Sequence, residues 1–298
     1  RYWEIWNEPD LQTTDEGCQG SPTWGGSRKE FVKFWKIAQT HLKKRFPDIR
    51  LGGPALAHAA DWGEAMVKEF AAEKVPLDFY SWHGYGVRPD QDADLARRIR
   101  KFLDANGYRD CESIYDEWNY VKGWGRDRPY SREVECGRFA QKGAAYAGAV
   151  MNVMQNEPVD MLMYYDARVC GMNGLFSRGS NLPMRGYYVF NAWNRLRRLG
   201  TQVKAESTLK DVTVTAAKGE DGRIGLFIVR YDEDNNVTAP ATVRVRLGSG
   251  KPLAGVTGHL TDEARIFTEY VPDAYPDGSL SLTLHPCSFI YLETAKAK

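Results

Sequence analysis

The chain has 298 residues, a length that suits one large domain or two of ordinary size. Hydrophobic residues make up 43% and charged residues 27%, so the chain can bury a sizeable core and is not a disordered tail. Forty Lys and Arg against 39 Asp and Glu leave a formal net charge of +1. This balance gives no electrostatic reason to expect nucleic acid or an anionic membrane as a partner.

Cysteine usage and hydropathy exclude further classes. The five cysteines are dispersed, and none forms a C-x-x-C pair: they are Cys18, Cys111, Cys136, Cys170 and Cys287. The pattern is that of neither a zinc site nor a dense disulfide framework. No run of about 18 apolar residues is present, and the first residues lack the charged and apolar regions of a signal peptide. We therefore expect no metal, no cofactor and no membrane span.

Residues 1–200 alternate short β-rich runs with longer amphipathic stretches, which is typical of βα units around a parallel sheet. The expected strands each run into polar residues and lie at residues 2–6, 50–52, 77–82, 112–115 and 161–164. Apolar residues at helical spacing predict crossover helices near residues 31–42, 95–103 and 139–154. A last helix is expected from about residue 187 to 199, with Gly200 at its C-terminal cap. The pattern predicts an α/β domain over residues 1–200.

Beyond Gly200 the apolar period changes from 3.6 to 2. Alternating apolar residues predict strands near residues 212–214, 224–228, 243–247, 280–284 and 289–291. Turn sequences such as Asp277-Gly278 separate some of these runs. The pattern predicts an antiparallel β-sandwich domain over residues 201–298.

Two glutamates stand out because each follows a β-rich run. Glu8 comes after residues 2–6, and Glu117 comes after residues 112–115. In a (β/α) barrel the C-terminal ends of the strands converge on one face, so the two carboxyl groups could meet there. Such a pair can cleave a glycosidic bond: one carboxyl protonates the leaving oxygen, and the other attacks the anomeric carbon or activates water. Two solvated loop glutamates would explain the pattern equally well.

The text around both glutamates resembles a known family. Residues 3–11 (WEIWNEPDL) and 116–119 (DEWN) are similar to the retaining glycosidases of clan A, most closely glycoside hydrolase family 39, which includes β-xylosidases and α-L-iduronidases. Residues 51–55 (LGGPA) and 78–85 (DFYSWHGY) extend the resemblance. The resemblance implies a (β/α)8 TIM barrel whose Asn-Glu-Pro ends strand four and whose nucleophile ends strand seven. It also implies a retaining hydrolase that cleaves the O-glycosidic bonds of β-xyloside-like carbohydrates by double displacement.

The resemblance implies roles for individual residues. Glu8 would be the acid/base and Glu117 the nucleophile. Asn7 would hydrogen-bond the sugar 2-hydroxyl, His83 would line the glycone subsite, and Tyr85 would hold the nucleophile's carboxylate. A retaining mechanism predicts that the two carboxyl groups lie roughly 5–5.5 Å apart.

Aromatic residues on the presumed active face could stack on sugar rings. Trp118 and Tyr165 are the candidates retained as substrate-binding residues, and packing is an alternative use for each. Asp116 is a weaker candidate than its neighbour Glu117, because strand alternation sends the two side chains to opposite faces.

The resemblance also predicts an incomplete barrel. If Glu8 ends strand four, the chain holds strands four to eight and lacks strands one to three, and such a remnant has open edges. A separate N-terminal polypeptide that completes the barrel, a longer product, or a half-barrel homologue would each account for this. Two other functions stay open: a family 51-like arabinofuranosidase, and a non-catalytic carbohydrate-binding or structural fragment.

Overall fold

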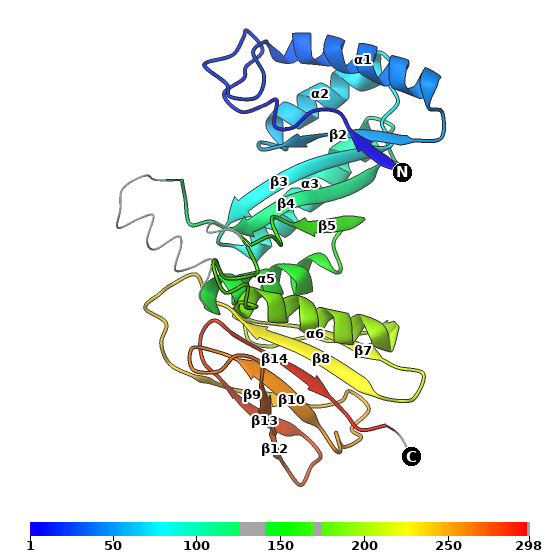
Figure 1. The fold of residues 1–298 in the computed structure, drawn as a ribbon. Coiled ribbons are helices and arrows are strands. Elements are labelled where there is room, and N and C mark those ends of the chain that lie inside the picture. Colours follow the sequence, from blue (N-terminus) through cyan, green and yellow to red (C-terminus); the bar gives the residue numbers. More distant parts are fainter. Residues whose placement is uncertain (125–140, 170–173, 297–298) are drawn as a thin grey trace. The chain divides into compact units, whose positions relative to one another are not determined.

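The computed structural model describes residues 1–124, 141–169 and 174–296 (Figure 1). The chain forms two compact units. The first comprises residues 1–85, 90–118 and 154–165, and the second comprises residues 86–89, 119–153 and 166–298. The start of the helix predicted over residues 139–154 lies outside the described residues, as do Cys136 and Cys170. The domain boundary that the sequence suggests at residue 200 stays a prediction.

A five-stranded sheet in chain order forms the first unit's framework. Its strands are β1 (Tyr2–Glu4), β2 (Arg50–Leu56), β3 (Phe79–Gly86), β4 (Glu112–Tyr120) and β5 (Met161–Tyr164). Strand β1 pairs in parallel with β2, β2 with β3, and β4 with β5. The parallel βα pattern read from the sequence is thereby confirmed.

Helices connect the successive strands (Figure 1). They are α1 (Arg28–Arg45), α2 (Asp61–Ala72), α3 (Pro89–Ala105) and, between β4 and β5, α5 (Gln141–Met154). Helix α1 begins at Ser27, whose side chain accepts from the Glu30 N–H while the Glu30 carboxylate accepts from the Ser27 N–H. This capping box satisfies two backbone donors of the first turn. The sequence analysis did not foresee α2.

Large aromatic side chains fill much of the first unit's core. Trp82 of β3 and Tyr115 of β4 stack with ring centroids 3.9 Å apart and planes at 9°, and both are fully buried. Burying a side chain of this size stabilises the fold by about 1.5–3 kcal/mol. The stack fixes β3 beside β4, which are the two strands that carry most of the site described below.

The strand ends differ from the prediction. The sequence places the ends of the third and fourth strands at residues 82 and 115, but β3 continues to Gly86 and β4 to Tyr120. The backbone at the end of β4 remains hydrogen-bonded to its neighbour. The Tyr165 N–H, for example, donates to the Trp118 carbonyl at 3.2 Å. Strand β1 is instead shorter than expected, because Trp6 has a φ of +75°, which no strand residue adopts.

The second unit contains two antiparallel sheets. The six-stranded sheet has the order β11-β10-β14-β8-β7-β6, and the three-stranded sheet has the order β12-β13-β9. The strands, in chain order, are β6 (Thr201–Val203), β7 (Val212–Lys218), β8 (Ile224–Arg230), β9 (Ala241–Val245), β10 (Thr257–Thr261), β11 (Thr268–Tyr270), β12 (Asp273–Ala274), β13 (Leu280–Leu284) and β14 (Ser288–Glu293). One hydrophobic cluster includes residues of both sheets, among them Ile290 of β14 and Leu282 of β13.

Helix α6 (Arg185–Leu199) packs against β7 and β8. It begins two residues before the predicted start and ends, as predicted, at Gly200, whose φ of +97° suits a residue without a side chain.

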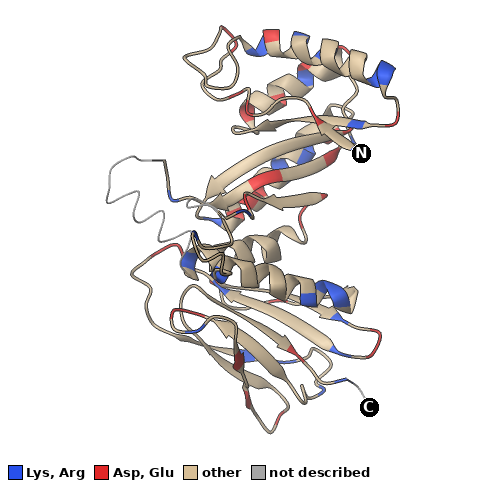
Figure 2. Cartoon of the chain, in the orientation of Figure 1, with Lys and Arg blue, Asp and Glu red and all other residues tan. Residues whose placement is uncertain are grey.

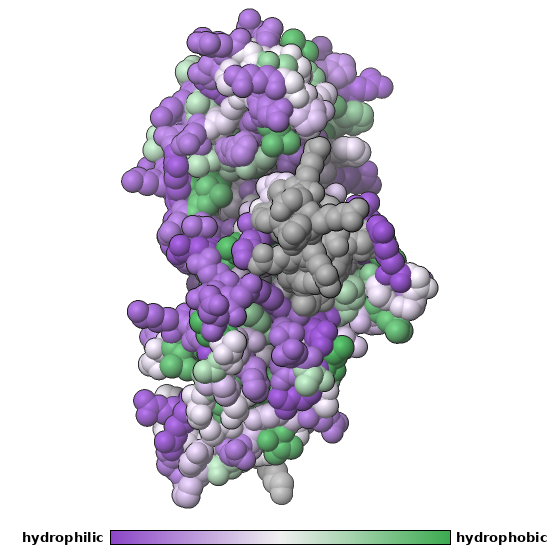
Figure 3. All heavy atoms as spheres, turned by 90° about the vertical axis from the view of Figure 1, so that its left-hand side faces the viewer, coloured by the Kyte–Doolittle hydropathy of each residue, from purple (hydrophilic) through white to green (hydrophobic). Residues whose placement is uncertain are grey.

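The charges of the chain are mixed in sign. Figure 2 shows Lys and Arg interspersed with Asp and Glu along the elements, which agrees with the net charge of +1. On the face drawn in Figure 3, hydrophilic residues predominate and apolar ones form small separate groups. Within the described ranges, no helix has both the length and the apolar character needed to cross a membrane.

Candidate active site

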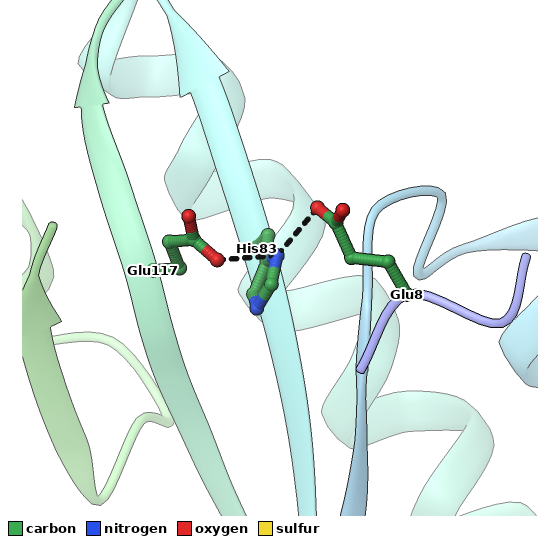
Figure 4. A group of neighbouring side chains, drawn as sticks. All are labelled: Glu8, His83 and Glu117. Carbon is green, nitrogen blue, oxygen red and sulfur yellow. Dashed lines mark hydrogen bonds and ion pairs between the residues drawn. The ribbon is translucent and has the colours of Figure 1, made fainter. Parts of the chain in front are cut away.

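Two carboxylates converge on one imidazole in the first unit (Figure 4). Nδ1 of His83 lies 2.9 Å from Oε1 of Glu8 and 3.0 Å from Oε2 of Glu117. A ligand oxygen of each glutamate lies within 4.8 Å of the other. His83 is buried, whereas the two glutamate side chains keep 21% and 17% of their surface exposed. The sequence therefore identified two glutamates, 109 positions apart in the chain, that the fold brings together.

The strands position these side chains by simple alternation. His83 and Tyr85 lie two residues apart on β3, so both point to the same face, and Glu117 faces them from β4. Gly84 separates the first two. The Tyr115 hydroxyl donates to the Gly84 carbonyl at 3.0 Å, and a Cβ at Gly84 would collide with that hydroxyl. A glycine is needed here because the core residue approaches so closely.

Tyr85 is a second partner of Glu117. Its hydroxyl donates to Oε1 of Glu117, while His83 contacts Oε2. Burial, and then the hydrogen bond to the Glu117 carboxylate, raise the pKa of Tyr85 far above its usual value. The phenol therefore keeps its proton and acts as a permanent donor to this carboxylate.

Glu8 sits in an unusual backbone conformation. Its φ is +48°, in the left-handed region that residues other than glycine rarely adopt. The Glu8 N–H donates to the Ala55 carbonyl of β2 at 3.0 Å, which ties this turn to the sheet. Residues in such conformations persist only where their surroundings fix them, and they cluster at functional sites.

A second carboxyl pair lies beside the first. Asp116 precedes Glu117 on β4, and its Oδ1 lies 3.7 Å from Nε2 of His83. Burial, together with the neighbouring Glu4, raises the pKa of Asp116 well above its usual range. The raised pKa favours the protonated form of Asp116 beside the Glu4 carboxylate. The Ser81 hydroxyl donates to Glu4 and accepts from the Ala55 N–H at 2.9 Å.

The remaining predicted residues lie around this centre. Asn7 is exposed beside Glu8, and Tyr165 is exposed at the end of β5. Trp118 is only 1% exposed and packs edge-on against Tyr164 at 5.1 Å. A sugar ring needs an open aromatic face, so the burial of Trp118 argues against the predicted substrate contact and in favour of its alternative use in packing.

Sequence reasoning missed several residues that hold the site in place. Glu4, Ser81 and Asp10 were not singled out, although Asp10 is buried and accepts from the backbone N–H groups of Ala57 and His58. Ser81 could have been predicted from the sequence, because it lies two residues before His83 on the same strand and therefore on the same face. Asp10 directly follows the Asn7-Glu8-Pro9 sequence and could have been flagged as a polar residue too close to the site to be incidental.

The chemistry of this centre is that of paired carboxylates. One imidazole and two carboxylates are ligands that can also hold a divalent cation. The arrangement can supply one carboxylate as a nucleophile and one carboxylic acid as a proton donor to a bond placed between them.

Comparison with known proteins finds similarity to glycosyl hydrolases. Residues 1–136 match the family described as Glycosyl hydrolases family 39. A beta-xylosidase from Caldicellulosiruptor saccharolyticus is 31% identical over 133 residues, which cover 40% of this chain and 25% of that protein. A beta-xylosidase from Geobacillus stearothermophilus is 32% identical over 89 residues, which cover 28% of this chain and 16% of that protein. The chain thus aligns with a quarter or less of either relative.

Solved structures show the same class of fold. A monomeric beta-xylosidase from Caulobacter crescentus CB15 has a TM-score of 0.74 at 16% identity, and the match covers 99% of this chain and 69% of that one. A glucosidase from Croceicoccus marinus has a TM-score of 0.71 at 17% identity, with the same coverage. These likenesses support the barrel part of the predicted fold class, a partial (β/α)8 barrel, and do not specifically test the β-sandwich.

Proposed function

We propose, because residues 1–136 match the family described as Glycosyl hydrolases family 39, that the chain is a glycosidase acting on β-xyloside-like substrates by double displacement with retention. The observation that carries this proposal is the convergence of Glu8 and Glu117 on His83. Two of the relatives reported above are called beta-xylosidases, which supports the substrate class.

The spacing of the carboxylates favours a retaining mechanism. Retaining glycosidases hold their two carboxyl groups about 5–5.5 Å apart, whereas inverting enzymes separate them by about 6.5–9.5 Å to admit a water. Ligand oxygens of Glu8 and Glu117 lie within 4.8 Å of each other. This distance suits direct attack by one carboxylate on a carbon whose leaving oxygen is protonated by the other.

The contacts of the two glutamates suggest which is the nucleophile and which is the acid. Glu117 accepts a hydrogen bond from Tyr85 and lies 3.0 Å from Nδ1 of His83, contacts that stabilise a carboxylate anion, so we assign it as the nucleophile. Glu8 has one such partner, His83, and we assign it as the acid that protonates the leaving oxygen. Once the glycosyl group is bonded to Glu117, the deprotonated Glu8 accepts a proton from the attacking water.

Further contacts to the sugar are assigned to exposed neighbours. Asn7 would donate to the 2-hydroxyl, His83 would line the glycone subsite, and Tyr165 would offer an aromatic surface at the end of β5.

The parallel sheet is proposed to be strands four to eight of the barrel. In the described residues β1 pairs only with β2, and β5 only with β4. Trp3 of β1 is 60% exposed and Met163 of β5 is 46% exposed, which is unusual for a parallel sheet. We propose that strands from a separate N-terminal polypeptide or segment cover these edges. The shared hydrophobic cluster of the second unit supports a β-sandwich of its two sheets.

The stereochemistry of the first product tests the proposed function. We expect the protein to hydrolyse an aryl β-xyloside and ¹H NMR to show the β-anomer of xylose before mutarotation. Initial appearance of the α-anomer would contradict the retaining mechanism. Native mass spectrometry of the same sample shows whether a second polypeptide accompanies this 33.8 kDa chain. Failure to hydrolyse any aryl glycoside when the barrel is complete would overturn the enzyme proposal in favour of a binding fragment.

Removal of the Tyr85 hydroxyl is expected to weaken the nucleophile. Tyr85→Phe deletes one donor to Glu117 and changes little volume. A hydrogen bond to a charged group contributes about 1.5–3 kcal/mol, so kcat/KM should fall by about 10- to 100-fold. Steady-state kinetics on an aryl β-xyloside measures the loss. Tyr275→Phe, an exposed tyrosine of the second unit, is the matched control and should retain full activity. An unchanged kcat/KM for Tyr85→Phe would remove Tyr85 from the site.

A further inference from the structure

We infer that Thr23 is a positioning residue that holds Glu8 in its left-handed conformation. The Thr23 hydroxyl donates to the Glu8 carbonyl, and the Trp6 indole N–H donates to the Thr23 carbonyl at 3.0 Å. Thr23 thus contacts both residues of this turn whose φ is positive, Trp6 at +75° and Glu8 at +48°. The inference rests on the proposed role of Glu8 as the acid.

The cost of the left-handed conformation explains why the two hydrogen bonds of Thr23, here called the Thr23 clasp, are needed. A side-chain-bearing residue in the left-handed region costs about 1–2 kcal/mol, and two lie within three positions here. The Glu8 N–H is fixed by the Ala55 carbonyl, and the Glu8 carbonyl also accepts from the Leu11 N–H at 3.3 Å. Without Thr23 the Glu8 carbonyl would lose its side-chain donor and keep only this longer backbone hydrogen bond. One hydrogen bond contributes about 0.5–1.5 kcal/mol, which is comparable to the strain at a single residue.

The loop that carries Thr23 is itself anchored. The Ser21 hydroxyl accepts from the Thr23 N–H at 3.2 Å and from the Trp24 N–H at 3.1 Å. The Trp24 ring packs edge-on against Trp6 at 5.6 Å and against Phe31 of α1 at 5.3 Å. These contacts hold the loop against α1 and the turn, so the hydroxyl of Thr23 is presented from a fixed surface.

Loss of the Thr23 clasp should lower the rate of the step in which Glu8 acts as an acid. If the peptide after Glu8 rotates, the Glu8 carboxyl moves relative to Glu117, and a displacement of about 1 Å can cost about 100-fold in rate. The loss should fall on the step that needs Glu8 as an acid. A poor leaving group needs protonation and a good one does not.

The test uses Thr23→Val, which removes the hydroxyl and keeps the shape, and Thr23→Ser, which restores the hydroxyl. The control is Thr14→Val in the same loop, whose hydroxyl donates to the Gly17 carbonyl at 3.0 Å and does not contact Glu8. We expect kcat/KM of Thr23→Val to fall by about 10- to 100-fold with a poor leaving group and less than about threefold with a dinitrophenyl leaving group. Thr23→Ser should recover most of the loss, and Thr14→Val should show none.

Three outcomes would overturn the inference: wild-type kinetics for Thr23→Val, equal losses on both substrates, or the same loss in Thr14→Val. Absence of turnover in the wild-type protein would instead reject the proposed function. A crystal structure of Thr23→Val then decides the inference without turnover. A Glu8 φ that has left the left-handed region supports the clasp, and an unchanged φ overturns it.

Discussion

Glu117→Gln is expected to abolish turnover while leaving the fold intact. The substitution keeps the volume of the side chain and one oxygen, but an amide cannot form the ester bond to the anomeric carbon. Removal of a nucleophile typically costs several orders of magnitude, so kcat/KM on an aryl β-xyloside should fall by on the order of 10⁴-fold or more. Thermal unfolding followed by circular dichroism should give a Tm close to that of the wild type.

The control for this variant is Glu16→Gln, which changes an exposed glutamate of the same unit. A surface substitution of this kind usually alters the free energy of unfolding by less than about 0.5 kcal/mol, and activity should be unchanged. The nucleophile can also be identified by its product. Azide added to Glu117→Ala should yield the α-xylosyl azide, because the small anion attacks from the side that the carboxylate has left. Activity of Glu117→Gln near the wild-type level would assign the nucleophile elsewhere.

The framework of the site could be predicted because it depends on local pattern. Runs of β-rich residues that end in polar ones identified the five strands, and the sequences around Glu8 and Glu117 identified the carboxylate pair before any geometry was known. These features depend on neighbours within a few residues.

What the sequence did not reveal depends on contacts between distant segments. Trp118 follows Glu117 directly, and only the packing of Tyr164 against it shows that its ring is buried. Thr23 lies in a loop without a regular period, and its contact with Glu8 spans 15 positions. The raised pKa of Asp116 likewise depends on burial and on Glu4, which comes from another strand. Periodicity carries no information about such pairings.

Glu8→Ala is expected to separate substrates by their leaving groups. The parameter to measure is kcat/KM, which reports the step in which the glycosyl group is transferred to Glu117 and the leaving oxygen departs. A dinitrophenolate departs without a proton, so its kcat/KM should stay within about tenfold of the wild type. A poor leaving group such as methoxide requires the acid, and its kcat/KM should fall by about 10²- to 10⁴-fold.

The dependence on pH gives a second and independent readout of Glu8. In the wild type the alkaline limb of the kcat/KM profile for a poor leaving group reports loss of the proton from the essential acid, and Glu8→Ala should remove that limb. Azide should rescue kcat of this variant and yield the β-xylosyl azide, since the anion now replaces water on the glycosyl intermediate; this product is the opposite anomer to that expected from Glu117→Ala. Equal losses on both leaving groups, or an alkaline limb that persists in the variant, would show that another group protonates the leaving oxygen. Because Glu8 and Glu117 both contact His83, that result would leave Glu8 with a positioning role through the imidazole.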